Sequence, residues 1–319
     1  MKGATLLIIT VTLNPAIDKT IYLKNYHHGQ VNIIDKTILD PGGKGINVSK
    51  VLNSFSCSYI SLGFTGGMDG KILEQHLSDA GIQYKFTPVK ANTRTNTKMI
   101  ESSTGKTTDL NEQGDEISLE ELNRFIDGYR EIVKDGDTVV LSGSAPKGIP
   151  QNIYYQLCEI ALQVGAKVIL DSKGPLLKEA LKSSVFLIKP NVEELESLSE
   201  KPFDHFDEIV DYCNELISNN VEYICLSMGS EGALLIGKDL FLQAKVPTVE
   251  AKSTVGAGDS LLGAMIGYLS SGYSMKESFA YGVSASVLAV SKEGTKAPTM
   301  DEIEEFVHKI KIIDMKVKK

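Results

Sequence analysis

The chain has 319 residues, of which 42% are apolar, and its formal net charge is −8. That length and apolar fraction are typical of a globular protein with a substantial core. The acidic balance argues against a general nucleic-acid-binding protein, whose surface would be basic. No apolar stretch approaches the roughly 20 residues needed to cross a bilayer. The four cysteines lack disulfide or zinc spacing. We therefore expect a cytoplasmic protein with no membrane or nucleic-acid partner.

Short β-branched runs alternate with helical patterns along most of the chain. Runs with the length of buried strands are 6–12, 59–64, 138–142, 167–171, 185–188 and 222–227, and helical patterns cover 47–55, 71–79, 118–133, 151–164 and 206–218. Continuous apolar runs are typical of strands in parallel sheets. The alternation predicts an α/β fold, a doubly wound and mostly parallel sheet flanked by helices, in one domain over residues 1–319. Ligands of such sheets bind where the strands end.

Two regions interrupt this alternation. Residues 17–39 and 82–110 contain short strand-like runs rich in polar residues, which are typical of sheets exposed on one face. We interpret both regions as one small antiparallel sheet that projects as a lid, with a pair of irregular surface hairpins as the alternative. Further along, Gly237-Lys238-Asp239 separates two apolar runs and predicts a hairpin of antiparallel edge strands.

A glycine-rich loop leads into an apolar segment at Ser253-Thr254-Val255-Gly256-Ala257-Gly258-Asp259-Ser260. Residues 261–269 are apolar on nearly every face and predict a buried helix. The free N–H groups at the start of a helix bind anions, and glycines let the backbone approach a phosphate closely. Asp259 in the first turn could accept a hydroxyl proton beside a transferring phosphoryl group. Alternatively, it only complements the helix dipole, a role that needs no flanking glycines.

A second glycine-rich loop, Pro41-Gly42-Gly43-Lys44-Gly45, opens the helix predicted from Asn47. Its N–H groups, the Lys44 ammonium and the Asn47 amide could bind hydroxyls or phosphate, although glycine-rich helix starts are common. Arg94 stands in an otherwise uncharged stretch and could clamp a phosphate, or it could be a lone surface arginine. Asp18 could accept hydrogen bonds from sugar hydroxyls, or it could stabilise a turn.

Two further strand ends carry candidate nucleotide contacts. Asn191-Val192-Glu193-Glu194 has the pattern of a helix capping box, and Glu194 could also orient the water shell of a Mg²⁺ ion. The segment from Ser227 to Gly232 could contact a ribose or a phosphate, or it could be a plain turn. Neither the Walker pattern nor the dinucleotide fingerprint GxGxxG is complete anywhere in the sequence.

These segments, in this order, resemble the PfkB (ribokinase-like) carbohydrate kinases over nearly the whole chain. The segments that carry the resemblance are 14–18, 42–47, Arg94, 142–146, 189–191 and 253–260. The last is the most specific, because a GAGD loop with a catalytic aspartate is the family signature. Both glycine loops are closest to the phosphosugar branch.

The resemblance implies a role for each matching residue. Asp259 would be the general base, with Gly256, Ala257 and Gly258 as the anion hole. The sugar phosphate would contact Asp18, Gly43, Lys44, Asn47, Arg94 and Ser144, and ATP would contact Lys189, Asn191, Ser227, Gly229 and Gly232. Glu194 would bind Mg²⁺ through water. Ser253 and Val255 match the loop where some members hold a monovalent cation such as K⁺, although Lys292 and Lys296 occupy the second loop of that site.

The expected reaction is ATP-dependent phosphorylation of a ketohexose phosphate, first of all fructose 1-phosphate to fructose 1,6-bisphosphate. Tagatose 6-phosphate and fructose 6-phosphate remain alternative substrates. A non-catalytic regulator that binds sugar phosphate or nucleotide is an alternative of another class, and the incomplete fingerprint disfavours a nicotinamide-dependent dehydrogenase. The family resemblance further implies a homodimer formed through the lid sheet.

Overall fold

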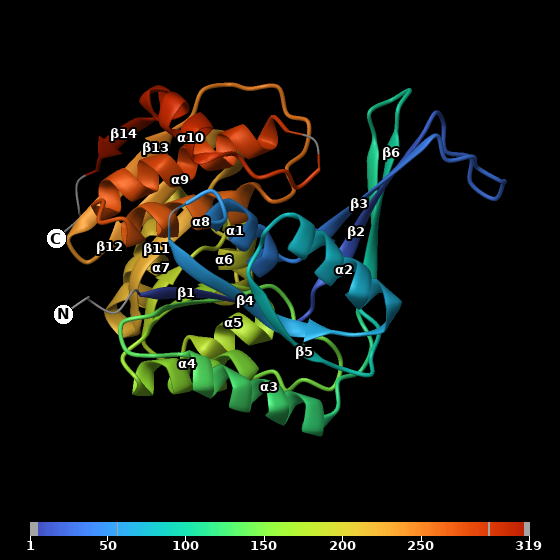
Figure 1. Ribbon diagram of the computed structural model, residues 1–319. Coiled ribbons are helices and arrows are strands. Elements are labelled where there is room, and N and C mark those ends of the chain that lie inside the picture. The colour runs from blue at the N-terminus through green and yellow to red at the C-terminus, as the bar shows by residue number, and fades with distance from the viewer. Residues whose placement is uncertain (1–5, 56, 293, 316–319) are drawn as a thin grey trace.

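The computed structural model describes residues 6–55, 57–292 and 294–315, which form two sheets and the helices around them (Figure 1). The main sheet has ten strands, in the spatial order β14 (Lys311–Asp314), β13 (Leu240–Lys245), β12 (Ala233–Gly237), β11 (Val221–Ser227), β10 (Val185–Ile188), β9 (Lys167–Asp171), β8 (Thr138–Ser142), β1 (Leu7–Thr12), β4 (Ser58–Thr65) and β5 (Tyr84–Pro88). All pairs from β11 to β5 are parallel. The predicted hairpin supplies β12 and β13, which are antiparallel.

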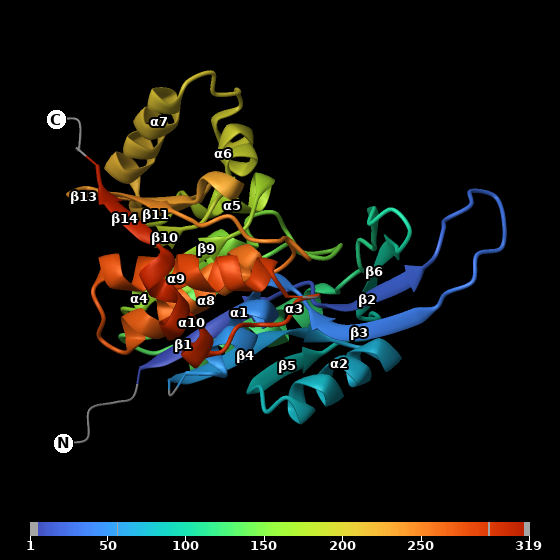
Figure 2. The same cartoon turned by 90° about the horizontal axis from the view of Figure 1, so that it is seen from above.

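Helices cover both faces of the main sheet (Figure 2). One face packs against α3 (Leu119–Ile132), α4 (Ile153–Gln163), α5 (Gly174–Ala180), α6 (Val192–Ser199) and α7 (Phe206–Asn219). The other packs against α1 (Lys44–Leu52), α2 (Gly67–Asp79), α8 (Ala257–Ser270) and α9 (Met275–Val290), with α10 (Met300–Phe306) behind them. Neighbouring strand residues alternate between the two cores: Ile9 and Val11 face the first, and Ile8 faces the second. The predicted fold class is confirmed. No helix within the described ranges is long and apolar enough to span a membrane.

The small sheet projects from the body of the molecule, with the order β3 (Lys36–Gly42), β2 (Ala16–Leu23), β6 (Arg94–Glu101) and β7 (Thr107–Asn111). Its outer pairs are antiparallel, whereas β2 and β6 in the middle run parallel. Residues 31–35 form no strand, and β3 begins only at Lys36.

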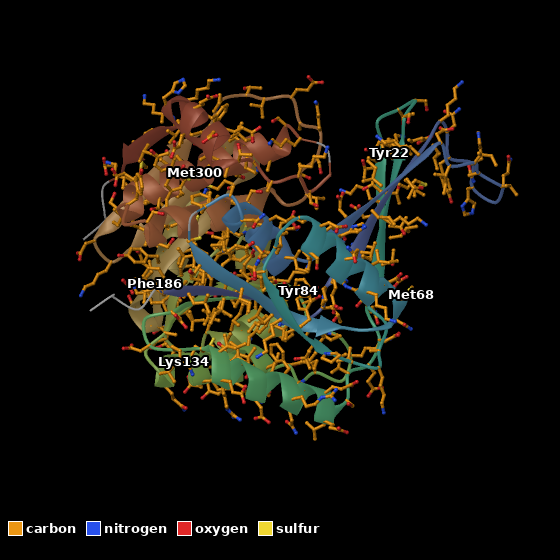
Figure 3. All side chains as sticks on the ribbon, in the orientation of Figure 1. Tyr22, Met68, Tyr84, Lys134, Phe186 and Met300 are labelled. Carbon is orange, nitrogen blue, oxygen red and sulfur yellow. The ribbon has the colours of Figure 1, made fainter. Side chains whose placement is uncertain are left out.

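The lid boundary predicted at residue 82 is wrong. Residues 84–88 form β5, which pairs in parallel with β4 at the edge of the main sheet. The rings of Tyr84 and Phe86 stack on one another and pack against a main-sheet core, which holds this strand there. Figure 3 shows Tyr84 on the body of the molecule and Tyr22 out on the small sheet. The second lid segment therefore begins at Arg94.

Candidate active site

A cavity of about 610 Å³ lies where the main-sheet strands end and the small sheet begins. Its position agrees with the general rule that open α/β sheets bind ligands at the carboxyl ends of their strands. Most of the residues singled out in the sequence line it: Asp18, Gly43, Lys44, Asn47, Arg94, Ser144, Lys189, Asn191, Glu194, Ser227, Val255, Gly256, Gly258 and Asp259. The fold thus gathers residues from both glycine-rich loops and from the small sheet around one cavity.

The start of α8 has the features expected of an anion site. Gly256 has a left-handed backbone (φ 78°), and its carbonyl accepts the first helical hydrogen bond, from the Ser260 N–H at 2.8 Å. The amides of residues 257–259 therefore have no partner within the helix, and no side chain caps them. A side chain at Gly258 would stand 2.8 Å from Lys189 Nζ, so glycine lets that ammonium approach the loop.

Asp259 is nearly enclosed, with 6% of its surface exposed, and it accepts a 2.8 Å hydrogen bond from Asn47 Nδ2. Burial raises the pKa of Asp259 to about 6, and the charge of Asp171 adds to the rise. Lys44, the Asn47 amide and Lys189 act in the opposite direction. Such a carboxylate is ionised at neutral pH yet basic enough to accept a hydroxyl proton.

Two lysines share one buried carboxylate beside this loop. Lys44 Nζ lies 2.9 Å and Lys189 Nζ 3.4 Å from Asp171 Oδ1. Burial alone would raise the pKa of Asp171, but the two ammonium groups outweigh it and the pKa is lowered. Burial likewise disfavours the Lys44 cation, but Asp171, Glu194 and Asp259 outweigh that effect and raise its pKa. The cluster keeps two positive charges near the anion-binding loop. Sequence reasoning missed Asp171, because an aspartate that ends a strand is unremarkable by itself.

Arg94 is held in place by backbone carbonyls. Its Nε and Nη2 donate to the Asn14 carbonyl at 3.2 and 3.0 Å, and its Nη1 donates to the Glu112 carbonyl at 2.7 Å. A guanidinium has five N–H groups, so donors remain for a ligand in the cavity that Arg94 lines. Arg94 is therefore anchored by the backbone at the cavity, and its role as a phosphate clamp stays a prediction.

Asp18 stands on β2 and accepts a 3.0 Å hydrogen bond from Asn96 Nδ2 on neighbouring β6. Burial raises the pKa of Asp18, and the bond from Asn96 opposes the rise. Gly42 is required beside it, because a side chain there would lie 2.3 Å from the carboxylate. Asn96, which sequence reasoning missed, lines the same cavity and adds a second polar group next to Asp18.

Glu194 forms the predicted capping box of α6. Its Oε2 accepts from the Asn191 N–H at 3.1 Å, and Asn191 Oδ1 accepts from the Glu194 N–H at 2.7 Å. The other oxygen, Oε1, lies 3.7 Å from Lys44 Nζ, which leaves it able to accept hydrogen bonds from the water shell of a cation. The residue therefore fits both interpretations of its sequence pattern. Within the described ranges, no group of three or more His, Cys, Asp or Glu residues could by itself hold a metal.

Four predicted contacts do not line the cavity: Ala257, Gly229, Gly232 and Ser253. Gly229 and Gly232 lie in and beside a short turn after β11, and Ser253 accepts a hydrogen bond from the Val255 N–H. Gly232 has a structural role: its φ is 95°, and a side chain there would collide with the Ala244 carbonyl. Lys292 of the second cation loop is bound by both oxygens of Glu302, at 2.8 and 2.6 Å.

Comparisons with known proteins agree with this geometry. A family model described as the pfkB family of carbohydrate kinases matches residues 11–302. The chain is 35% identical to a 1-phosphofructokinase of Bacillus subtilis, over 95% of this chain and 97% of that protein. It is 31% identical to a tagatose-6-phosphate kinase of Staphylococcus epidermidis, over 97% and 100%. The structure of phosphofructokinase-2 from Escherichia coli in complex with potassium superposes with a TM-score of 0.90 at 28% identity, covering 95% and 98%.

The chain belongs to the pfkB family of carbohydrate kinases. The two relatives described above are named as kinases of phosphorylated sugars, so the predicted resemblance to the phosphosugar branch is confirmed.

Proposed function

We propose that this protein transfers the terminal phosphoryl group of ATP to fructose 1-phosphate and forms fructose 1,6-bisphosphate. One observation carries the proposal: the buried Asp259 carboxylate lies in the first turn of α8, beside free amides, and lines the same cavity as Arg94 and Asp18. A base, an anion site and a phosphate-binding cation are the groups that phosphoryl transfer to a sugar phosphate requires.

In the proposed reaction, Asp259 takes the proton of the attacking sugar hydroxyl as its oxygen forms a bond to the γ-phosphorus. The bond from that phosphorus to the bridging oxygen of ATP breaks, and ADP leaves with the electron pair. The amides of Ala257 and Gly258, with Lys44 and Lys189, stabilise the charge on the transferring group. Asp18, Gly43, Asn47 and Ser144 orient the sugar, while Asn191 and Ser227 contact the nucleotide. Closure of the small sheet would exclude water.

Mg²⁺ is the expected metal, and it would neutralise charge on the ATP phosphates. Glu194 would hold it through water, since one carboxylate oxygen caps α6 and the other stays available. A monovalent cation near Ser253 and Val255 is a separate part of the proposal. Its support is a 28% identical relative whose structure contains potassium.

A substrate panel tests the proposed reaction. Purified protein with ATP and Mg²⁺ should release ADP with fructose 1-phosphate at a higher kcat/KM than with fructose 6-phosphate or tagatose 6-phosphate. A preference for tagatose 6-phosphate would favour the function named for the Staphylococcus relative. Absence of turnover with all three, together with nucleotide binding, would favour a non-catalytic regulator.

Arg94→Ala should raise the KM for the sugar phosphate by about tenfold or more and change the KM for ATP by less than about twofold. The reason is that Arg94 stands at the small-sheet side of the cavity, among the proposed sugar contacts. Initial rates with each substrate varied in turn measure the split. Arg94→Lys keeps the positive charge but loses the forked guanidinium. Its KM for the sugar phosphate should therefore lie between those of the wild type and Arg94→Ala. Equal changes in both KM values would contradict a role as phosphate clamp.

The small sheet supports the proposal of a homodimer. The connection between β2 and β3 exposes apolar side chains, with Val31 90% and Ile33 75% exposed, and Tyr26 and Ile34 in the same segment are exposed too, as is Leu39 of β3. Exposed apolar groups clustered on a projecting sheet are typical of interaction surfaces. Sedimentation equilibrium should therefore show two chains per particle, and Val31→Asp with Ile33→Asp should yield monomers. A wild-type monomer at micromolar concentration would refute the dimer.

A further inference from the structure

Lys50 lies on α1, three residues after Asn47, and nothing in its sequence pattern suggested a function. Its ammonium is partly buried and donates two hydrogen bonds, to Asn47 Oδ1 at 3.1 Å and to Thr295 Oγ1 at 2.8 Å. Burial lowers the pKa of Lys50, and the carboxylates of Asp40, Asp18 and Asp259 oppose that shift. A lysine enclosed in this way, next to the proposed reaction centre, calls for an explanation.

The bond from Lys50 reinforces the orientation in which the NH₂ end of the Asn47 amide faces Asp259. An ammonium group can only donate, so it requires the carbonyl oxygen of Asn47 on its own side. The NH₂ group of Asn47 then points the other way and donates to Asp259 Oδ2 at 2.8 Å. In the reversed amide, oxygen would face the carboxylate and NH₂ would face the ammonium. Two hydrogen bonds would become two repulsive contacts.

The second bond from Lys50 reaches the loop that lies against the anion site. Thr295 lines the cavity, and a methyl group on Gly256 would come within 3.8 Å of its side chain. The adjacent Gly294 approaches Asp40 of the small sheet, where an added Cβ would stand 3.3 Å from Oδ2. Lys50 therefore connects α1 to Thr295, which lines the cavity near Gly256 at the start of α8.

We propose that Lys50 is a positioning residue of the proposed kinase reaction: it fixes the Asn47 amide so that its N–H group orients the Asp259 carboxylate, and it secures Thr295 beside the anion-binding loop. The inference rests on the proposed function. Lys50 itself exchanges no proton with substrate. Its effect reaches the reaction through Asn47, whose side chain bonds to both Lys50 and Asp259.

Removal of Lys50 has a specific consequence for the base. The Asn47 amide keeps only its bond to Asp259, so the N–H partner that holds the pKa of Asp259 down is less firmly fixed. The positive charge of Lys50, which interacts with Asp259, is removed as well. The other charged groups that face Asp259 stay in place: Asp171 raises its pKa, and Lys44 and Lys189 lower it. The pKa of Asp259 should therefore rise, and its carboxylate should lose its fixed orientation.

The test compares Lys50→Met, Lys50→Arg and Lys71→Met, a control at an exposed lysine of α2. Lys50→Met should lower kcat by about tenfold or more, as misplaced catalytic groups do, and should move the acidic limb of kcat/KM to higher pH. Lys50→Arg should retain most of the wild-type kcat and most of the wild-type pH profile, and Lys71→Met should change neither kcat nor the profile. In an Asn47→Ala background, Lys50→Met should change kcat by less than about threefold, because coupled residues are not additive.

Either of two kinetic results would overturn the inference: a Lys50→Met profile that superimposes on wild type, or a full effect of Lys50→Met in the Asn47→Ala background. Circular dichroism checks that each variant folds, and Lys50→Gln replaces Lys50→Met if the latter does not. Titration of the Asp259 carboxyl by ¹³C NMR, assigned with Asp259→Asn, needs no turnover. If the wild type phosphorylates no sugar phosphate, the proposed function fails, and an unchanged Asp259 pKa in Lys50→Met would separately refute the role of Lys50.

Discussion

Asp259→Asn should lower kcat by about 10³-fold and leave the binding of both substrates nearly unchanged. Asparagine has the same shape and can still accept the bond from Asn47 Nδ2, but it cannot take a proton from the attacking hydroxyl. General bases typically contribute 10²- to 10⁴-fold to a rate. ADP release under saturating substrate measures kcat, and calorimetric titration measures binding. Activity within tenfold of wild type would remove Asp259 from the mechanism.

The pH dependence of the wild type follows from the same group. Because burial raises the pKa of Asp259 to about 6, the base is protonated below that pH. The value of kcat/KM should therefore fall about tenfold per pH unit below pH 6 and should be flat just above it. A profile that stays flat down to pH 5 would show that no group with this pKa controls the reaction.

The Asp259→Asn substitution should also stabilise the fold. A carboxyl whose pKa is raised on folding binds its proton more tightly in the folded state, so its ionised form opposes folding. This cost is absent below about pH 4, grows between pH 4 and 6, and is constant at higher pH. Asp259→Asn should thus raise Tm at pH 7.5 by a few degrees and leave it unchanged at pH 4. Thermal unfolding at both pH values separates this effect from a general change in packing.

Asp171→Ala should have the largest effect on stability. The substitution leaves Lys189, which is 6% exposed, without its acid and also frees Lys44. Removing one partner of a buried ion pair typically costs about 3–5 kcal/mol. Urea unfolding should show a loss near the lower end of that range, since Lys44 can turn toward solvent. The value of kcat should fall as well, because both lysines lose their fixed positions.

Two further variants make the Asp171 result specific. Asp211→Ala, at an exposed aspartate of α7, should change the free energy of unfolding by less than about 0.5 kcal/mol. Asp171→Leu combined with Lys189→Met should recover part of the stability and none of the activity. An Asp171→Ala protein as stable as wild type would mean that the two ammonium groups are satisfied without that carboxylate.

Much of the fold could be predicted from local patterns. Strands β8, β9 and β10 have the predicted bounds, because their continuous apolar runs are buried on both faces. The strand at 84–88 was wrongly assigned to the small sheet, because it is not a continuous apolar run. It is an edge strand of the main sheet, so polar Lys85 and Thr87 alternate with aromatic residues, as they would in the small sheet. The alternation shows that one face of the strand is exposed, but it does not show to which of the two sheets the strand belongs.

The site was predictable only where a motif marks it. The glycine content of the two loops predicts that helices begin there, and residues of both loops line the cavity. Asp171 and Lys50 carry no such mark. Asp171 bonds to a lysine 127 positions away, and Lys50 bonds to a threonine 245 positions away. Pairings at this range are created by the topology of the sheet, so a single sequence does not reveal them.

The route of the chain from β3 into α1 has a mechanical consequence. β3 ends at Gly42 and α1 starts at Lys44, so Gly43, with φ 119°, is the one joint between the projecting sheet and the helix that carries Lys44, Asn47 and Lys50. Along this connection, a rotation of the sheet would be absorbed at Gly43 or passed on to the helix. Binding of the ligand by the small sheet and alignment of the reacting groups on α1 would then be mechanically coupled rather than separate events.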